Sequence, residues 1–586
     1  MLDGSSSDAM TDRDANLSPR EGEQRRDLLT ISVEDYFHVA GFQKLIRPGH
    51  WYRFERRIEQ NTRRALDLLD EFGARATFFT LGWVAEQVPE VIKGIVARGH
   101  EVATKGYYHR SINEMTPAEF REDLQHAKEV IERATGVRVV GHRAARGTLG
   151  PDQYWALQIL AEEGFAYDAT LYPWLRAVAA EPWRRFPHVH RFGERQIWEI
   201  PYSTWHFAGN LLPIAGGNSL RQLPHWLMRR LIHGWHTHYD QPFVMYFHVW
   251  ELDAELPRIS AAPAWTRLRQ YRNLDRMPAL LRDYLSRYSF GPVMEHLGIE
   301  PQAAVARESL DVQVGKAAEQ SAREQVPVTV VVPCFNEEKV LPYLENTLRQ
   351  VSAKLSQSYA LEFVFVDDCS NDDTWNVMQK LFGKRPDCRF VRHEQNSGVA
   401  AAILSGIRHA HTEIVCSIDC DCTYDPHQLV DLIPALEPDV AMVTASPYHP
   451  SGRVLNVPRW RLFLSKNLSA LYRRVCRHKL WTYTSCFRVY RRSRVADLPV
   501  VEGGFLGITE MLGLLDRQGY KIVERPAVLE VRMLGRSKMR LWPTISGHLR
   551  LLSRLAASRW HGELTDAPSA AATVTEAYTA PTEQSR

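Results

Sequence analysis

The order of apolar and polar residues predicts alternating strands and helices in the first half of the chain. Residues 28–37 and 76–83 carry apolar runs of strand length, whereas residues 57–73 repeat apolar positions at helical spacing. A further segment of this kind, 90–104, leads from a helical pattern into an apolar run. Strands separated by helices of this length predict parallel β/α units, so we expect an α/β fold.

A second β/α pattern begins near Val326, after a polar, Ala-rich stretch that resembles a linker. Three apolar runs follow, in residues 326–338, 361–374 and 412–426, and each ends in polar or acidic residues. Both ends of the chain are polar and low in sequence complexity, which predicts disorder there. The expected organisation is a disordered N-terminus (1–27), a first domain (28–299), a linker (300–326), a second domain (327–560) and a disordered tail (561–586).

Composition narrows the class of protein. A chain of 586 residues is too long for one hydrophobic core, and 45% hydrophobic with 24% charged residues is typical of globular proteins. The formal net charge of +3 gives no reason to expect nucleic acid as a partner. No apolar run reaches the roughly 18–20 residues of a membrane-spanning helix, and the N-terminus lacks an apolar signal region. We therefore expect a cytoplasmic protein.

All eight cysteines lie between Cys334 and Cys486. Cys416, Cys420 and Cys422 alternate through an apolar run, and their spacing is not that of a zinc ribbon. Buried thiols are the better interpretation, and they fit a reducing compartment.

Three groups of polar residues follow predicted strands in the first domain. Glu34 and Asp35 come after the run 28–33, KGYYH places Lys105 and His109 four residues apart, and His248 ends an apolar run in FHVWELD. Adjacent carboxylates can act as a base and a metal ligand, and histidine can ligate a metal or transfer a proton. Singly, each has a structural explanation, such as a solvated turn or a hydrogen-bonded core histidine.

Taken in order, with GHRAARG between them, these motifs resemble the NodB-type polysaccharide deacetylases, closest to the subgroup of exopolysaccharide loci. The resemblance covers about residues 28–298 and includes ATFFTLGWVAE, GHEVATKGYYHR and LAEEGFAYDATLYP. It implies a distorted (β/α) barrel that holds Zn²⁺ or another divalent metal and hydrolyses an N-acetyl group. By position, Glu34 is the implied base, Asp35 and His109 are metal ligands, His248 is the acid and Arg143 orients the base.

Two positions depart from this family. Lys105 stands where the family has its first metal-binding His, and Ala145 stands where it usually has Pro. A protonated ammonium group repels a dication and cannot ligate it. Two interpretations therefore stay open: a metal-dependent deacetylase, or a catalytically dead glycan-binding module in which Lys105 forms a salt bridge to Asp35.

Carboxylates follow two buried strands of the second domain, after a first strand that ends in a Pro/Asn/Glu turn. Asp367 and Asp368 end the run in 361–374, and Asp419-x-Asp421 follows the run in 412–418. Such a strand-terminal DxD suits a divalent cation that bridges diphosphate oxygens, because Mg²⁺ and Mn²⁺ prefer hard oxygen ligands. The order and intervals of these segments are more specific than any one of them.

This pattern resembles the family-2 glycosyltransferases of the dolichyl- or polyprenyl-phosphate sugar synthase type. It covers about residues 327–555 and includes NSGVAAAILSGIRHA, YTSCFRVYRRS and GRSKM. The resemblance implies a Rossmann-like GT-A fold, a nucleotide-sugar donor and Mg²⁺ or Mn²⁺. The implied site comprises Pro333, Glu337, Asp367 and Asp368 at the nucleotide, Asp419 and the catalytic Asp421 at the metal, Ser485, Arg488 and Arg492 at phosphates, and Arg536 and Lys538 closing over the site.

The acceptor is either polyprenyl phosphate or a soluble saccharide. The segment 541–560 places Trp542, Ile545, Leu549, Leu552 and Ala556 at helical spacing among arginines, which predicts either a membrane-surface helix or a helix packed on its own domain. With a lipid acceptor, the protein would be peripheral at the inner face of the plasma membrane. In a fusion of this kind, the first domain would deacetylate, or bind, the product of the second.

Overall fold

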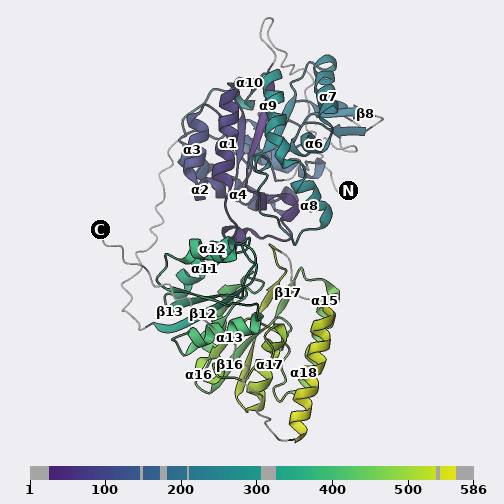
Figure 1. The fold of residues 1–586 in the computed structure, drawn as a ribbon. Coiled ribbons are helices and arrows are strands. Elements are labelled where there is room, and N and C mark those ends of the chain that lie inside the picture. The colour runs from purple at the N-terminus through teal and green to yellow at the C-terminus, as the bar shows by residue number, and fades with distance from the viewer. Residues whose placement is uncertain are drawn as a thin grey trace, which may run out of the picture. The chain divides into compact units, whose positions relative to one another are not determined.

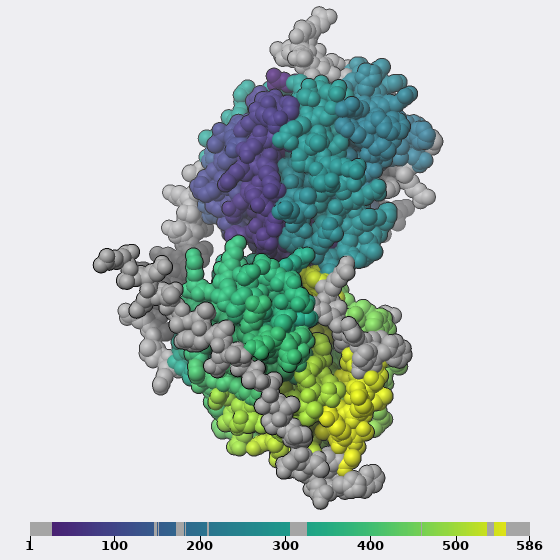
Figure 2. Space-filling view, viewed as in Figure 1, coloured from purple at the N-terminus to yellow at the C-terminus, as the bar shows by residue number. Residues whose placement is uncertain are grey.

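The structure is a computed structural model that describes residues 26–145, 149–171, 181–207, 210–304, 325–535 and 541–561. The chain divides into two compact units: the first comprises the described residues up to 304 without Tyr52–Glu55 and Pro257–Ala261, and the second comprises those two segments and the described residues from 325. The first is coloured purple to teal and the second green to yellow, in the ribbon (Figure 1) and in the space-filling view (Figure 2).

The first unit is built on one mostly parallel sheet. Its hydrogen-bonded order is β10-β1-β2-β3-β4-β5-β7-β6, and β11 also pairs with the first two residues of β1, on the edge of β1 opposite β10. Only β6 runs antiparallel to its neighbour on this path. Its strands are β1 (Asp27–Val33), β2 (Thr77–Thr80), β3 (Glu101–Thr104), β4 (Gly141–His142), β5 (Tyr167–Asp168), β6 (His188–Phe192), β7 (Arg195–Glu199), β10 (Val244–His248) and β11 (Phe290–Gly291).

Helices alternate with these strands as the sequence pattern predicts. α1 buries Ile58, Ala65 and Leu69 against the sheet, which explains its helical repeat of apolar residues. α4 begins with a capping box, in which Thr116 and Glu119 satisfy each other's free backbone amides. The helices are α1 (Ile58–Glu71), α2 (Gly82–Gln87), α3 (Pro89–Ala97), α4 (Pro117–Thr135), α5 (Tyr154–Glu162), α6 (Gly217–Gln222), α7 (His225–His238), α8 (Ala264–Tyr271), α9 (Met277–Arg287) and α10 (Val293–His296).

The sheet follows the strand order of an open, distorted barrel. Within the described residues, no hydrogen-bonded pairing joins β10 to β6, so the ladder does not close. A separate hairpin of β8 (Thr204–Phe207) and β9 (Asn210–Pro213) lies outside this sheet. Glu34, Lys105 and Arg143 directly follow β1, β3 and β4, and His248 ends β10. Because parallel strands end at one edge, the fold brings these four residues to the same side of the sheet.

The second unit has a Rossmann-like GT-A fold. Its sheet has the order β14-β13-β12-β15-β18-β16-β19, in which β18 is antiparallel to both of its neighbours. A small sheet of β17 and β20 lies apart from it. The strands are β12 (Val326–Cys334), β13 (Tyr359–Asp367), β14 (Cys388–Arg392), β15 (Ile414–Ser417), β16 (Val440–Ser446), β17 (Arg453–Leu455), β18 (Arg488–Arg491), β19 (Lys521–Pro526) and β20 (Val528–Glu530).

The central strands of this unit are buried, as their continuous apolar runs predict. Val330, Val331 and Val332 of β12 are at most 1% exposed. All eight cysteines are free thiols, and Cys416, Cys420 and Cys422 are buried, as expected. The helices are α11 (Leu341–Leu355), α12 (Thr374–Phe382), α13 (Val399–His409), α14 (Leu429–Leu432), α15 (Arg459–Val475), α16 (Arg492–Val495), α17 (Phe505–Arg517) and α18 (Leu541–His561).

The last helix, α18, packs on its own unit. Leu551, Leu552 and Leu555 join the hydrophobic core with α17 residues, and Tyr472 of α15 contacts the buried His548. Of the predicted apolar face, Leu552 is buried, whereas Leu549 is 54% exposed. The face of α18 is therefore divided between core and surface. None of the helices in the described residues has the length and apolar character needed to cross a membrane.

Candidate active sites

Glu34 is the centre of a buried polar cluster in the first unit. Its Oε2 atom lies 2.8 Å from Nζ of Lys105 and 3.2 Å from Nε2 of His109. Its Oε1 atom lies 2.7 Å from Nδ1 of His248. Glu34 and Lys105 are 1% and 4% exposed. The predicted base, acid and one metal ligand are thus brought together, with Lys105 among them.

The charges of this cluster are coupled. Burial alone would raise the pKa of Glu34, but Lys105, His109 and His248 outweigh it and hold that pKa well below its usual value. Burial lowers the pKa of Lys105, and the attraction of Glu34 partly offsets this. Burial, with Lys105 nearby, lowers the pKa of His109 to about 4. Glu34 is therefore an ionised carboxylate paired with an ammonium group, which makes it a weak general base.

Asp35 is occupied by backbone amides. Its Oδ1 atom accepts a hydrogen bond from the amide of Tyr36 at 3.0 Å, and its Oδ2 atom accepts from the amides of Arg57 and Ile58 at 2.8 and 3.1 Å. Asp35 thereby caps the 3-10 helix Tyr36–His38. The predicted salt bridge from Lys105 to Asp35 is wrong, because Lys105 forms its salt bridge with Glu34.

Arg143 does not contact the predicted base. Its guanidinium donates to the carbonyl of Ala169 and to the hydroxyl of Thr30, both at 3.0 Å. It also stacks over Phe79 and Tyr202, with its Cζ atom 4.0 and 4.7 Å from the ring centroids. Arg143 is therefore a buried structural cation behind the cluster, and Lys105, His109 and His248 fix Glu34 in its place. Ala145, the second departure, lies in the bend that follows β4.

The residues of the first unit do not fit a catalytic metal ion. Of the three ligands that the resemblance implies, Asp35 accepts hydrogen bonds from backbone amides, His109 is present, and the third is replaced by Lys105, whose ammonium is fixed on Glu34. Across the described residues of both units, no three His, Cys, Asp or Glu side chains form a group that could hold a metal by themselves.

The second unit contains a cavity of about 780 Å³ at the ends of its parallel strands. Of the predicted site residues, it is lined by Pro333, Glu337, Asp368, Asp419 and Asp421. These residues follow or end β12, β13 and β15, so the fold gathers the three predicted polar segments into one space. Apolar side chains of α15 and α18, with Phe505 of α17, form part of the remaining wall.

Asp419 and Asp421 form an acidic pair in this cavity. Burial and the neighbouring Asp421 raise the pKa of Asp419 to about 7. The backbone amide of Thr423 donates to Oδ1 of Asp421 at 3.0 Å, which fixes that carboxylate. Crowded, buried carboxylates are stabilised by a cation, and two carboxylates with added diphosphate oxygens suit Mg²⁺ or Mn²⁺. The donor set therefore fits the predicted divalent ion.

Arg532 is a site residue that the sequence analysis missed. Its guanidinium contacts Oε2 of Glu337 and lies 3.4 Å from Oδ2 of Asp421. Burial alone would lower the pKa of Arg532, but Asp421 and Glu337 raise it. The only signal for it in the sequence is its position three residues before GRSKM. Arg536 and Lys538, which were predicted from that motif, lie outside the described residues.

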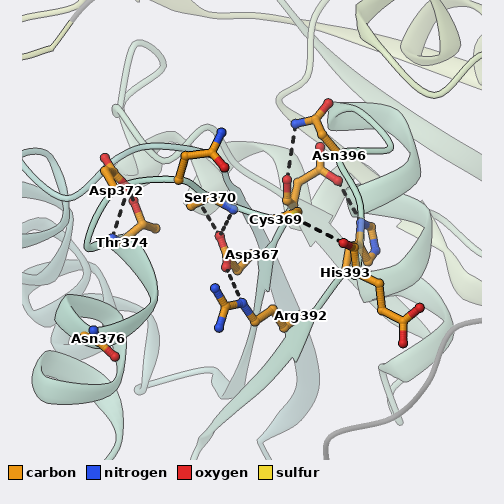
Figure 3. Close-up of polar contacts among 12 residues, drawn as sticks. Asp367, Cys369, Ser370, Asp372, Thr374, Asn376, Arg392, His393 and Asn396 are labelled. Atoms are coloured by element: carbon orange, nitrogen blue, oxygen red, sulfur yellow. Dashed lines mark hydrogen bonds and ion pairs between the residues drawn. The ribbon is translucent and has the colours of Figure 1, made fainter.

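Asp367 and Asp368 have different roles. Asp367 is fully buried, accepts hydrogen bonds from Ser370 and lies 3.1 Å from Nε of Arg392 (Figure 3). Asp368 faces the cavity and accepts from the backbone amides of Ser397 and Gly398 at 2.8 and 2.7 Å. Asp367 thus holds the strand end, and Asp368 shapes the loop before α13.

The predicted phosphate contacts lie elsewhere. Arg488 is fully buried and donates to the carbonyls of Ile508 and Tyr483 at 2.6 and 2.8 Å. Arg492 donates to the carbonyls of Ile407 and Arg408 at 3.2 Å. The structure does not place either of them, or the buried Ser485, in the cavity wall. The two arginine side chains bind backbone carbonyls of their own unit. The sequence motif alone does not show which way these side chains point.

Three family models match different parts of the chain. Residues 49–166 match the polysaccharide deacetylase family model, 171–298 match a domain of unknown function (DUF3473), and 329–498 match glycosyl transferase family 2. The chain is therefore similar to polysaccharide deacetylases in its first part and to family-2 glycosyltransferases in its second.

Two curated relatives are similar to part of the chain. A dolichol-phosphate mannosyltransferase from Pyrococcus furiosus is 28% identical over 238 residues, 40% of this chain and 65% of the relative. A polyprenol monophosphomannose synthase from Mycolicibacterium smegmatis is 28% identical over 218 residues, 36% of this chain and 80% of the relative. The chain thus spans just under two thirds of the first of these proteins.

Two solved structures align with parts of the chain. A CE4 family pseudoenzyme from Bacillus anthracis aligns with 47% of this chain and 66% of its own, at 13% identity and a TM-score of 0.26. A glucosyl-3-phosphoglycerate synthase from Mycobacterium tuberculosis, solved with Mn²⁺ and uridine diphosphate, aligns with 40% of this chain and 80% of its own, at 20% identity and a TM-score of 0.30.

Proposed function

We propose that the second unit transfers a sugar from a nucleotide-sugar donor to polyprenyl phosphate. The observation that carries this proposal is the composition of the 780 Å³ cavity, whose lining combines carboxylates that follow the strands with apolar side chains of α15 and α18. Such a cavity suits an acceptor that joins a phosphate to a long hydrocarbon chain. The names of two curated relatives, a dolichol-phosphate mannosyltransferase and a polyprenol monophosphomannose synthase, support the same acceptor class.

The acidic end suits the donor. Asp419 and Asp421 would hold Mg²⁺ or Mn²⁺, which would offset the charge of the donor's diphosphate. Arg532, already placed between Glu337 and Asp421, supplies a guanidinium within reach of phosphate oxygens. Pro333 and Asp368 shape the neighbouring wall, where the nucleoside would lie.

The apolar wall suits the acceptor. Trp460 and Leu464 of α15 and Leu549 of α18 line the cavity and are also 51%, 36% and 54% exposed. Arg461 and Lys466 add exposed positive charge on α15. An apolar surface flanked by cations favours contact with anionic lipid headgroups. We therefore propose peripheral attachment to the inner face of the plasma membrane through α15 and α18.

The transfer needs no dedicated general base. The acceptor phosphate is ionised at neutral pH, so one of its oxygens can form a bond to the anomeric carbon of the sugar while the bond from that carbon to the diphosphate oxygen breaks. The nucleoside diphosphate leaves with the electron pair. Asp421 and Arg532 would position the leaving group, and the apolar wall would limit the access of water.

Organic extraction tests the acceptor. Labelled nucleotide sugars are incubated with the full chain, a divalent cation and either polyprenyl phosphate or a soluble saccharide. We expect label in the organic phase only with the lipid, and a loss of at least about 100-fold for Asp421→Asn, because that substitution removes a charge from the reacting centre. Glu437→Gln, an exposed site outside the cavity, is the matched control. Label confined to the aqueous saccharide would contradict the lipid acceptor.

The first unit has two candidate functions, and each would act on the product of the second unit. Its family match supports N-deacetylation of an N-acetylated sugar. The Lys105–Glu34 pair favours the alternative, a non-catalytic glycan-binding module. Acetate release from chitooligosaccharides by the full chain separates them: turnover supports the deacetylase, and saturable binding without turnover supports the binding module.

A further inference from the structure

Lys105 is positioned as a permanent part of the polar cluster. It directly follows β3, and its backbone amide donates to the carbonyl of Thr80 at 2.8 Å, which fixes the base of the side chain. Its ammonium contacts Oε2 of Glu34 at 2.8 Å and the hydroxyl of Ser32 at 3.4 Å. A 4% exposed ammonium held in this way cannot leave for solvent without abandoning a buried carboxylate.

His109 nevertheless keeps the arrangement of a metal ligand. Its Nδ1 atom lies 2.8 Å from the carbonyl oxygen of His38, which selects the tautomer with the proton on Nδ1. Nε2 then carries a lone pair, and this buried atom makes no hydrogen bond within the described residues, although it is 3.2 Å from Oε2 of Glu34. A buried nitrogen without a hydrogen-bond partner is costly, and a bound cation is one way to satisfy it.

We propose that Lys105 is a built-in substitute for a metal ion and that this one residue keeps the remaining ligands from binding a divalent cation. The ammonium balances the charge of Glu34, and His109 is left oriented toward a position that no dication can share with Lys105. The first unit then works without a bound metal. The inference concerns the first unit alone and is independent of sugar transfer by the second.

Metal content tests this proposal on the full chain. Asp419→Asn/Asp421→Asn serves as the background, so that the second unit does not contribute. Each protein is loaded with Zn²⁺, desalted and analysed by plasma mass spectrometry. The protein that retains Lys105 should bind no more zinc than the same protein with His109→Ala. The Lys105→His protein should bind about one equivalent, because the introduced imidazole would complete a three-ligand site. Zinc bound by the Lys105→His protein should be lost again with His109→Ala.

Two outcomes would overturn the proposal. Stoichiometric zinc in the chain that retains Lys105, lost with His109→Ala, would show that the ammonium does not exclude the metal. A folded Lys105→His protein without zinc would show that Lys105 is not the obstacle. If Lys105→His fails to fold, the measurement on the chain that retains Lys105 still decides, since a Zn²⁺-dependent rise in its melting temperature that requires His109 would also contradict the proposal.

A double-mutant cycle on Glu34 and Lys105, measured by melting temperature, tests separately whether the ammonium balances the charge of the carboxylate. Glu34→Gln should lower the melting temperature of the wild type, because it leaves the Lys105 ammonium buried without a carboxylate. The same change in a Lys105→Met background should have a much smaller effect. Equal effects in both backgrounds would mean that Glu34 and Lys105 are not coupled, and the assignment of Lys105 as the balancing cation would fail.

Discussion

Arg488 shows how a motif residue can be structural. The sequence predicted a phosphate contact, but the guanidinium is fully buried and bound to two backbone carbonyls. Arg488→Met should therefore lower the free energy of unfolding by about 2 kcal/mol, because it leaves those carbonyls without a donor. Arg492→Met, at a partly exposed site, should cost less. Urea denaturation measures both, and an Arg488→Met protein of normal stability but much weaker donor binding would restore the original prediction.

Arg532 gives a prediction with two opposite readouts. Its guanidinium lies beside Asp421 and Glu337, so Arg532→Ala removes a positive charge from the proposed cation site. We expect Mn²⁺ to bind more tightly to the donor-free protein, because electrostatic repulsion is removed, and sugar transfer to fall. Calorimetric titration with Mn²⁺ and the transfer assay measure the two effects. Arg532→Lys, which keeps the charge, should leave Mn²⁺ binding nearly unchanged.

At the residue scale, the sequence located the polar segments better than it assigned their side chains. Carboxylates at strand ends were predicted, and Glu337, Asp368, Asp419 and Asp421 do line one cavity. Which of two adjacent residues faces the cavity depends on local backbone turns, so the predictions for Asp367 and Asp368 could not be separated. Arg532 reaches the site from a distant part of the chain, which no local pattern indicates.

At the scale of elements, β6 contains a buried histidine pair. Nε2 of His188 lies 3.0 Å from Nε2 of His190, and burial lowers their pKa values to about 3 and about 4. Both lie below the value of about 6.5 expected in the unfolded chain. The unfolded state therefore binds protons first as the pH falls, so the stability that the neutral pair provides is full above about pH 6.5 and is lost toward pH 4.

Replacing one member of the pair tests this behaviour. Each buried histidine should contribute a slope of roughly 1.4 kcal/mol per pH unit between about pH 6 and 4. His190→Gln removes one titrating group and should flatten the fall in unfolding free energy over that range. His233→Gln, at an exposed position on α7, is the control and should leave the slope unchanged. Denaturant titrations at several pH values measure it, and an unchanged slope for His190→Gln would contradict the argument.

The sequence predicted elements well where apolar runs are long and continuous. β12 and β13 follow directly from such runs, and α1 follows from apolar positions repeated at helical spacing. The two-residue strands β4 and β5 and the antiparallel insertion of β18 could not be predicted, because pairing partners far along the chain define them. For α18, the periodicity correctly predicted a helix. It did not decide whether the apolar face packs on the domain or lies at the surface, because one amphipathic helix can do both.

At the scale of the whole molecule, the two units have separate sheets and separate hydrophobic cores. We therefore expect two unfolding transitions in calorimetry of the full chain. A nucleotide-sugar donor with Mn²⁺ should raise only the transition of the second unit, because a ligand stabilises the folded state that binds it. Asp421→Asn should abolish that shift and leave the other transition in place.

In the same calorimetric experiment, a substitution of Lys105 identifies the transition of the first unit. Lys105→Met leaves Glu34 buried without its cation, so it should move only the transition of the first unit and leave sugar transfer by the second at its wild-type rate. The two variants together assign each transition to one unit. If Lys105→Met or the donor moved both transitions, the units would be thermodynamically coupled. That result would contradict independent unfolding of the two units. The effect of the first unit on sugar transfer would then have to be measured in the intact chain.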